Sequence, residues 1–294
     1  MTGLPPEVIA QIRAADPENI PGQAASAWGL LTPFHEKTGY TAPQIDRDLV
    51  YGEHERNRLD IHHDTERRGS ALPVIVFVHG GGFVAGDKHV EGSPMYDHVG
   101  AWAVRHGAVG VTMTYRLAPE HQWPAGAQDV ASAVDWARKN IAAYGGDPGR
   151  IVVAGHSAGA VHVASFLTGQ GGGSLDGIAG GALLSGIYDL APGNRGQLEH
   201  AYYGQTTPDE ASTLDGLLEC PVPLLFSVAE RDPRQFHAQA AGVVAAWQAK
   251  HRTGPNLVWV EGHNHISEIA SLGIDEDALG TPLRRFVDHV TDDA

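Results

Sequence analysis

The sequence predicts an α/β fold in which helices flank a mostly parallel central sheet, within one domain of 294 residues. Apolar runs such as Val74–Val78 are continuous, which is typical of strands buried on both faces. Segments of helical periodicity separate these runs; Val130 and Val134 belong to a repeat of three and four residues within 126–143. Strands that alternate with helices form parallel sheets with right-handed crossovers.

The expected elements follow in chain order. A short amphipathic helix at 7–14 and a stretch rich in proline and glycine precede two short strands at 45–51 and 58–62. Buried strands are expected within 72–78, 107–116, 150–157, 180–186, 221–230 and 256–263. Helices are expected at 95–106, 126–143, 158–168, 235–252 and 282–290. Residues 1–43 are expected to form a small N-terminal cap over the site, and residues 190–220 a short lid insertion.

Composition limits the classes of partner. Lys and Arg number 20 and Asp and Glu 35, a net charge of −15 that repels nucleic acid and anionic membranes. We therefore expect a small ligand that is neutral or weakly charged, and leave a homodimer open. Cys220 is the single cysteine, which excludes an internal disulfide and fits a reducing compartment. Without a secretion-signal pattern or a membrane-spanning run, the chain is expected to be cytoplasmic.

Reactive side chains come directly after several predicted strands. In parallel sheets these strand ends share one edge, where ligands bind. The candidates are Ser157, then Asp189, Glu230 and Asp232, and finally His263 and His265. A serine hydroxyl becomes a nucleophile when a neutral imidazole takes its proton and a carboxylate orients that imidazole. The order of serine, acid and histidine therefore indicates nucleophilic catalysis, with the acid and the base still open.

The surroundings of the serine support this interpretation. Gly155 and Gly159 permit a tight turn from strand to helix that would expose Ser157. His156 is not expected to be the base, because adjacent side chains on such a turn point in different directions. The backbone N–H of Ala158, at the start of the helix, faces developing negative charge.

The segment "HGGGF", residues 79–83, supplies further backbone donors. Glycines have no Cβ, so the N–H groups of Gly81 and Gly82 can approach an oxyanion together with that of Ala158. The rival interpretation is nucleotide binding, since this loop also satisfies G-x-G-x-x-A. Gly86 and Asp87 interrupt the helix start which that motif needs, and no acidic residue closes a second strand about 20 residues on.

Histidine pairs raise the question of a metal. His263 and His265 lack the H-E-x-x-H or Cys/His framework of a zinc site. His62 and His63, on a strand expected at the sheet edge, are interpreted as a solvated pair. The sequence therefore predicts neither a metal nor another cofactor.

Five motifs in order resemble a known family. They are "HGGGF", "YRLAPE" (115–120), "GHSAG" (155–159), "ERDP" (230–233) and "HNHI" (263–266). From about residue 46 onward the chain is similar to α/β-hydrolase fold esterases of the hormone-sensitive-lipase-like type (bacterial family IV) and to the kynurenine formamidase-like branch. The resemblance implies Ser157 as nucleophile, Asp232 as acid, and the "HGGG" glycines as the oxyanion hole. It favours His265 over His263 as base, because the family's base precedes an apolar residue that opens a helix. It also implies a structural, pocket-shaping role for "YRLAPE".

Three features depart from the family's usual pattern. His156 and Ala160 stand where the family usually carries aspartate and glycine. "HNHI" replaces the usual His-Gly-Phe and is closer to the formamidase-like branch. The segment between Asp189 and Cys220 is short, in place of a long lid.

Together these observations predict a serine carboxylesterase for short-chain acyl esters. The alternatives are an amidase of the arylformamidase type and a ligand-binding member of the fold that has lost its chemistry. Residues expected to line the substrate site are Phe83, Trp123, His156, Tyr202 and Tyr203, with Phe34 also expected at the mouth.

Overall fold

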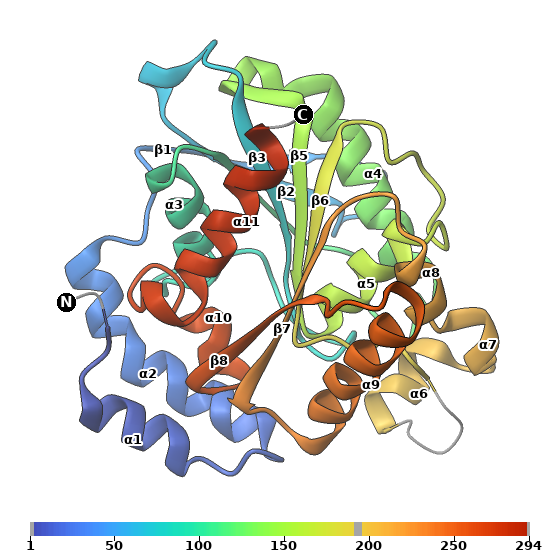
Figure 1. The fold of residues 1–294 in the computed structure, drawn as a ribbon. Helices are drawn as coiled ribbons and strands as arrows, with labels where there is room; N and C mark the ends of the chain where they lie inside the picture. The colour runs from blue at the N-terminus through green and yellow to red at the C-terminus, as the bar shows by residue number, and fades with distance from the viewer. Residues whose placement is uncertain (1–2, 191–195, 293–294) are drawn as a thin grey trace.

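In the computed structural model, which describes residues 3–190 and 196–292, eight strands form one sheet through the middle of the molecule (Figure 1). They are β1 (Gln44–Val50), β2 (Arg58–His63), β3 (Leu72–Val78), β4 (Val109–Met113), β5 (Gly146–His156), β6 (Ile178–Leu184), β7 (Leu224–Arg231) and β8 (Asn256–Asn264). Their spatial order is β1-β2-β4-β3-β5-β6-β7-β8. β2 is antiparallel to both its neighbours and all other pairs are parallel, so the predicted α/β class is confirmed.

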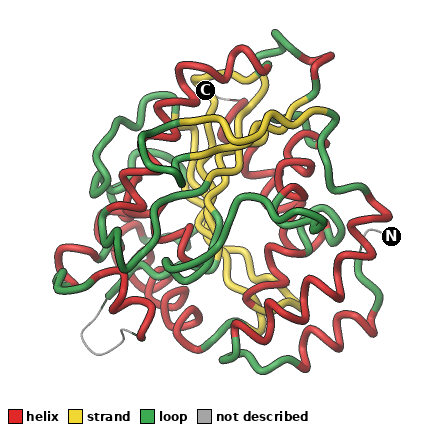
Figure 2. Tube along the Cα trace, turned by 180° about the vertical axis from the view of Figure 1, so that it is seen from behind, coloured by secondary structure: helices red, strands yellow, loops and turns green. Residues whose placement is uncertain are grey.

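Helices cover both faces of the sheet, as Figure 2 shows from behind. The α-helices are α1 (Pro6–Ala14), α2 (Ile20–Thr38), α3 (Asp97–Arg105), α4 (Ala125–Asn140), α5 (Ala158–Leu167), α6 (Gln197–Tyr203), α7 (Pro208–Ala211), α8 (Leu214–Leu218), α9 (Arg234–His251), α10 (His265–Ala270) and α11 (Thr281–Asp292). Short 3₁₀ turns η1 (Thr65–Arg67) and η2 (Ile141–Tyr144) and a π-helical turn η3 (Glu276–Gly280) complete the described elements. α4, α5 and α9 pack on one face, and α3, α10 and α11 on the other. Among the described helices, none combines the length and the apolar character needed to cross a bilayer.

The central strand β3 is apolar throughout because both of its faces are buried. Val74, Val76 and Val78 enter the core beneath α4 and α5, whereas Ile75 and Phe77 enter the core beneath α3 and α11. All five are buried. Because each buried side chain of this size contributes about 1.5–3 kcal/mol, both helical layers are held to the same strand.

The N-terminal segment differs from its prediction. α2 occupies the stretch that its prolines and glycines led us to expect as irregular. Pro21 lies in the first turn, where its missing N–H is harmless, and Asn19 caps the helix by accepting from Gly22 N–H at 3.1 Å. Pro33 is accommodated inside the helix, and Leu31 is fully buried in the cluster that includes α10. Tertiary packing therefore outweighs local propensity here.

The interpretation of His62 and His63 as a solvated pair is wrong. Both residues are fully buried, because β1 adds outside β2 and takes the edge position. Burial lowers the pKa of His62 to about 4, so its imidazole is neutral at physiological pH.

A buried ion-pair cluster joins the edge strands to α3. Arg47 on β1 contacts Asp60 on β2 at 2.8 Å and Asp97 on α3 at 2.6 Å, and Lys88 contacts Asp60 at 2.8 Å. Asp60, Asp97 and His62 place ligand atoms within 4.8 Å of one another, as a metal site would. Since two cations already bond these carboxylates, we interpret the cluster as structural.

Replacing Arg47 should lower the stability of the fold. Arg47→Met leaves two buried carboxylates short of a partner, and we expect the free energy of unfolding to fall by about 3 kcal/mol. Lys139→Met is the control, since Lys139 forms an exposed pair with Asp135 at 2.7 Å and should change stability by less than about 0.5 kcal/mol. Urea unfolding measures both variants. An equal, small loss in the two would show that the cluster adds little.

Candidate active site

Three polar side chains stand at the carboxyl ends of the parallel strands β5, β7 and β8. Ser157 follows β5, Asp232 follows β7, and His265 follows β8 and begins α10. Because these strands run parallel, the three chain segments end at one edge of the sheet.

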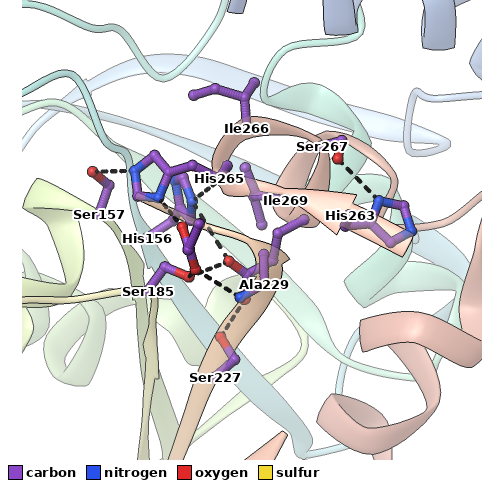
Figure 3. Close-up of polar contacts among 12 residues, drawn as sticks. His156, Ser157, Ser185, Ser227, Ala229, His263, His265, Ile266, Ser267 and Ile269 are labelled. Atoms are coloured by element: carbon purple, nitrogen blue, oxygen red, sulfur yellow. Dashed lines mark hydrogen bonds and ion pairs between the residues drawn. The ribbon is translucent and has the colours of Figure 1, made fainter. Parts of the chain in front are cut away.

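The structure brings these three side chains into contact, and Figure 3 shows Ser157 beside His265. His265 Nε2 lies 2.9 Å from Ser157 Oγ, and His265 Nδ1 lies 2.7 Å from Asp232 Oδ1. With Nδ1–H donating to the carboxylate, Nε2 is left to accept the serine proton. Phe236 packs against the imidazole with ring centroids 4.3 Å apart, which limits its rotation.

Hydrogen bonds hold Asp232 in its ionised form. Burial on its own raises the pKa of this carboxyl, but donors from His265, Ser185 and the Ala229 backbone together hold the pKa below its ordinary value. The Ala229 N–H donates to Oδ2 at 2.6 Å and the Ser185 hydroxyl lies 2.7 Å from the same oxygen. The carboxylate facing His265 is therefore negative and fixed in place.

The serine sits on a strained turn between β5 and α5. Ser157 has φ 57° and ψ −122°, a conformation that costs a non-glycine residue about 1–3 kcal/mol. The turn is tight enough to exclude side chains on both flanks. A Cβ on Gly155 would lie 2.4 Å from Gly159 O, and a Cβ on Gly159 would lie 2.1 Å from Val78 O. Ser157 itself is half-buried, so its hydroxyl can meet a ligand.

The glycine loop 79–83 lies against the serine. A Cβ on Gly80 would come within 3.2 Å of Ser157 Cβ. Gly81 and Gly82 have φ values of 131° and 59°, which turn the backbone in a way that favours glycine. Within the described residues, the N–H groups of Gly81, Gly82 and Ala158 have no acceptor. They are the donors that an oxyanion would need.

The "YRLAPE" segment supports this loop from behind. Tyr115 donates its hydroxyl to His79 O at 2.9 Å, and Ala118 N–H donates to Phe83 O at 3.0 Å. His79 donates from Nδ1 to Gly80 O at 2.6 Å. Burial lowers the pKa of His79 to about 4, so the ring is a neutral hydrogen-bonding group.

The other two histidines of this region do not contact the serine hydroxyl. His263 Nδ1 bonds Ser267 Oγ at 3.1 Å and its Nε2 bonds Asp275 at 3.3 Å, on the far side of the loop (Figure 3). His156 donates from Nε2 to the His265 carbonyl at 2.8 Å. Burial lowers the pKa of His156 to about 3, so it is neutral.

The remaining acidic candidates have other positions. Asp189 is exposed, and its backbone N–H bonds Gln239 at 2.9 Å. Glu230 accepts from Gly262 N–H at 2.7 Å and from Arg13 at 2.6 Å, which ties α1 to the ends of β7 and β8. Hydrogen bonding from Arg13 holds the pKa of Glu230 below its ordinary value.

The aromatic residues expected at the substrate site are more deeply placed than expected. Phe83 stacks on Tyr202 with ring centroids 4.4 Å apart, and Tyr202 and Tyr203 are each 1% exposed. These three rings belong to one buried cluster that includes residues of α5. Trp123 is half-buried in the same cluster. His156 is buried elsewhere, beside His265, with ring centroids 4.8 Å apart. Phe34 instead packs against α10.

Sequence analysis did not identify a cluster of buried polar side chains next to Asp232. Ser185, Ser227 and Glu268 are all buried next to Asp232. Ser185 is the first residue after β6, so the strand-end argument could have found it before Asp189. Glu268 lies three residues after His265, one turn along α10.

Comparisons with known proteins agree with this architecture. A family model described as BD-FAE matches residues 59–180. Esterase LipC of Mycobacterium tuberculosis is 36% identical over 113 residues, covering 38% of this chain and 27% of that protein. Carboxylesterase NlhH of the same organism is 49% identical over 89 residues, covering 30% of this chain and 26% of that protein. The structure of a hyperthermophilic esterase from the archaeon Pyrobaculum calidifontis matches with a TM-score of 0.68 and 21% identity, over 99% of this chain and 98% of that one.

The structural match shows that the chain has the α/β-hydrolase fold, and the resemblance to esterases is confirmed. The chain spans about a quarter of the length of the two curated relatives, 27% and 26%. The matched family region contains Ser157 and the glycine loop but ends before Asp232 and His265.

The turn around the serine yields a stability test. Gly159→Ala places a methyl group 2.1 Å from a carbonyl oxygen of β3, and we expect the free energy of unfolding to fall by about 3 kcal/mol. Gly29→Ala is the control, because nothing lies within 4 Å of its added Cβ inside α2. There the gain in helix propensity should stabilise by about 0.5–1 kcal/mol. Unfolding midpoints that move equally in both variants would contradict the close packing of the turn.

Proposed function

We propose that the chain is a serine carboxylesterase that works through an acyl-enzyme intermediate. The observation that carries the proposal is the contact of Ser157 with His265 at 2.9 Å and of His265 with Asp232 at 2.7 Å, beside a loop of free backbone amides. The named esterases among its relatives support ester hydrolysis as the reaction class.

The first half-reaction follows from these distances. Ser157 Oγ attacks the acyl carbonyl carbon while His265 Nε2 takes the hydroxyl proton. Asp232 stabilises the imidazolium that forms and keeps Nε2 directed at the serine. When the tetrahedral intermediate collapses, the imidazolium returns the proton to the alkoxide leaving group, and an alcohol departs.

The carbonyl oxygen becomes an oxyanion in this step. The N–H groups of Gly81, Gly82 and Ala158 would donate to it, and losing one such donor raises a barrier by about 2.7–4 kcal/mol. Water then repeats the attack on the acyl-serine with His265 as base, which releases the acid and restores the hydroxyl.

The position of α6 over the glycine loop favours substrates with a short acyl chain. Leu198 on α6 lies over the glycine loop, since a Cβ on Gly82 would meet Leu198 Cδ1 at 2.5 Å. Leu198 is 46% exposed, so one side of it faces solvent where an acyl group would enter. Phe83, the last residue of the loop, stacks on Tyr202 of α6, and both rings are buried, which supports limited room for a long acyl chain.

Covalent labelling tests the nucleophile. Diethyl p-nitrophenyl phosphate should phosphorylate Ser157 with loss of p-nitrophenol, because the reagent mimics an ester at the first step. Mass spectrometry should locate one label on the peptide containing Ser157, absent from Ser157→Ala and retained in Ser132→Ala, a serine on the exposed face of α4. An unlabelled protein would favour the ligand-binding alternative.

A substrate series tests the acyl and ester preferences. We expect kcat/KM to fall from p-nitrophenyl acetate and butyrate to the octanoate, and to be higher for the acetate than for N-formylkynurenine. Leu198→Ala should raise the octanoate-to-acetate ratio about tenfold by removing bulk at the loop. Val244→Ala, on α9, should leave the ratio unchanged. Faster turnover of the formamide would favour the arylformamidase alternative, and octanoate turnover equal to acetate would contradict the short-chain preference.

A further inference from the structure

A second carboxyl group lies directly behind the acid of the site. Glu268 on α10 is fully buried. Its Oε2 lies 2.5 Å from Ser185 Oγ, and its Oε1 accepts a hydrogen bond from Ser227. The nearest ring nitrogen is Nε2 of His156 at 4.0 Å, which already donates to a carbonyl and is neutral. Glu268 therefore has hydroxyl partners but no cationic one among the described residues.

The Ser185 hydroxyl has too few hydrogen atoms to donate to both carboxyl groups. The Ser185 hydroxyl lies between two carboxyls, 2.7 Å from Asp232 and 2.5 Å from Glu268, but it has one hydrogen to donate. Asp232 needs that hydrogen as a carboxylate facing His265. The short contact with Glu268 is then a hydrogen bond only if Glu268 carries a proton and donates it to Ser185.

We propose that Glu268 is a positioning residue that stays protonated during turnover and donates through Ser185 to Asp232, so that the buried site holds a single negative charge. The chain of donors runs from Glu268 to Ser185, then to Asp232 Oδ2, whose other oxygen accepts from His265. This inference deepens the proposed esterase mechanism and rests on it.

The surroundings of Glu268 agree with a neutral carboxyl. His156 faces it from β5, Tyr188 from the loop after β6, and Asp232 from the loop after β7. None of these groups supplies a positive charge. Burial, followed by repulsion from Asp232, raises the pKa of Glu268 to about 8. Below this value Glu268 keeps its proton, and above it a second negative charge appears beside Asp232.

The pH profile of kcat/KM in Glu268→Gln tests the proposal. An amide can donate to Ser185 and accept from Ser227, so activity at pH 7 should stay within about threefold of the parent. The parent should lose activity through an ionisation near pH 8, and the variant should lack that alkaline limb while its acid limb stays within about 0.2 pH unit. An acid limb displaced downward by about half a unit or more would show that a negative charge had been removed, and would overturn the proposal.

Two further variants test whether the alkaline limb belongs to Glu268. Glu230→Gln removes a carboxylate at the same end of β7 that already pairs with Arg13, and it should keep the alkaline limb. Ser227→Ala removes the donor that stabilises ionised Glu268, so the alkaline limb should move to higher pH by about half a unit. An unmoved limb in Ser227→Ala would assign it to another group and count against the proposal, even if Glu268→Gln failed to fold.

Infrared difference spectroscopy separates this inference from the esterase proposal. A protonated carboxylic acid has a C=O band that disappears on ionisation, and we expect one that titrates near pH 8. The band should be absent from Glu268→Gln and present in Ser157→Ala, which has no turnover to depend on. A band without ester hydrolysis would overturn only the esterase proposal. Hydrolysis without a band at pH 7 would overturn only the protonated Glu268.

Discussion

The close approach of the turn after β5 to the end of β3 is the constraint on which the site depends. Gly159 lies so near Val78 O that an added Cβ would be 2.1 Å from it, and this contact carries the start of α5 over the sheet edge. Ser157 is thereby presented beside the glycine loop that follows β3. The hydroxyl and the backbone amides are neighbours because two adjacent parallel strands, β3 and β5, end together. The strain at Ser157 persists because packing on both sides leaves the turn no other conformation.

Burial determines the charge of two other histidines near this edge. It lowers the pKa of His79 to about 4 and that of His156 to about 3, so these rings serve as neutral hydrogen-bonding groups. Asp232 remains charged because three donors point at it. Glu268, which has two hydroxyl partners and no cationic one in the described part of the chain, is driven toward its neutral form. One low-dielectric environment thus yields two carboxyls of opposite protonation, and the difference lies in their hydrogen-bond donors.

The parts of the fold that repeat a simple pattern could be predicted from the sequence. β3 is apolar throughout since both its faces are covered. The strand-end rule indicated Ser157 and a short set of acids and histidines at one edge of the sheet, and the family resemblance then favoured Asp232 and His265 within that set. α2 could not be predicted, since Pro33 and the glycines oppose a helix that packing against α10 stabilises. The burial of His62 could not be predicted either, because it depended on whether β1 or β2 lies at the edge of the sheet. Ser185 follows a predicted strand and lay within reach of the same rule. Glu268 could not be singled out, since its contact with Ser185 joins α10 to the end of β6 and no local pattern encodes it.

The proton-handling side chains lie apart in the sequence from the rest of the site. The matched family region, residues 59–180, contains Ser157 and the backbone amides of Gly81, Gly82 and Ala158. Asp232, His265 and Glu268 all come from the later part of the chain, where β7, β8 and α10 meet. They meet the serine turn through His265, which bonds Ser157 Oγ at 2.9 Å, and through His156, which donates to the His265 carbonyl and lies 4.0 Å from Glu268. A substitution at Glu268 changes the protonation of this group without replacing any part of the serine turn or the glycine loop. Differences in pH dependence among proteins of this fold should therefore follow the group behind the acid, whereas differences in acyl preference should follow residues such as Leu198 that lie over the amides.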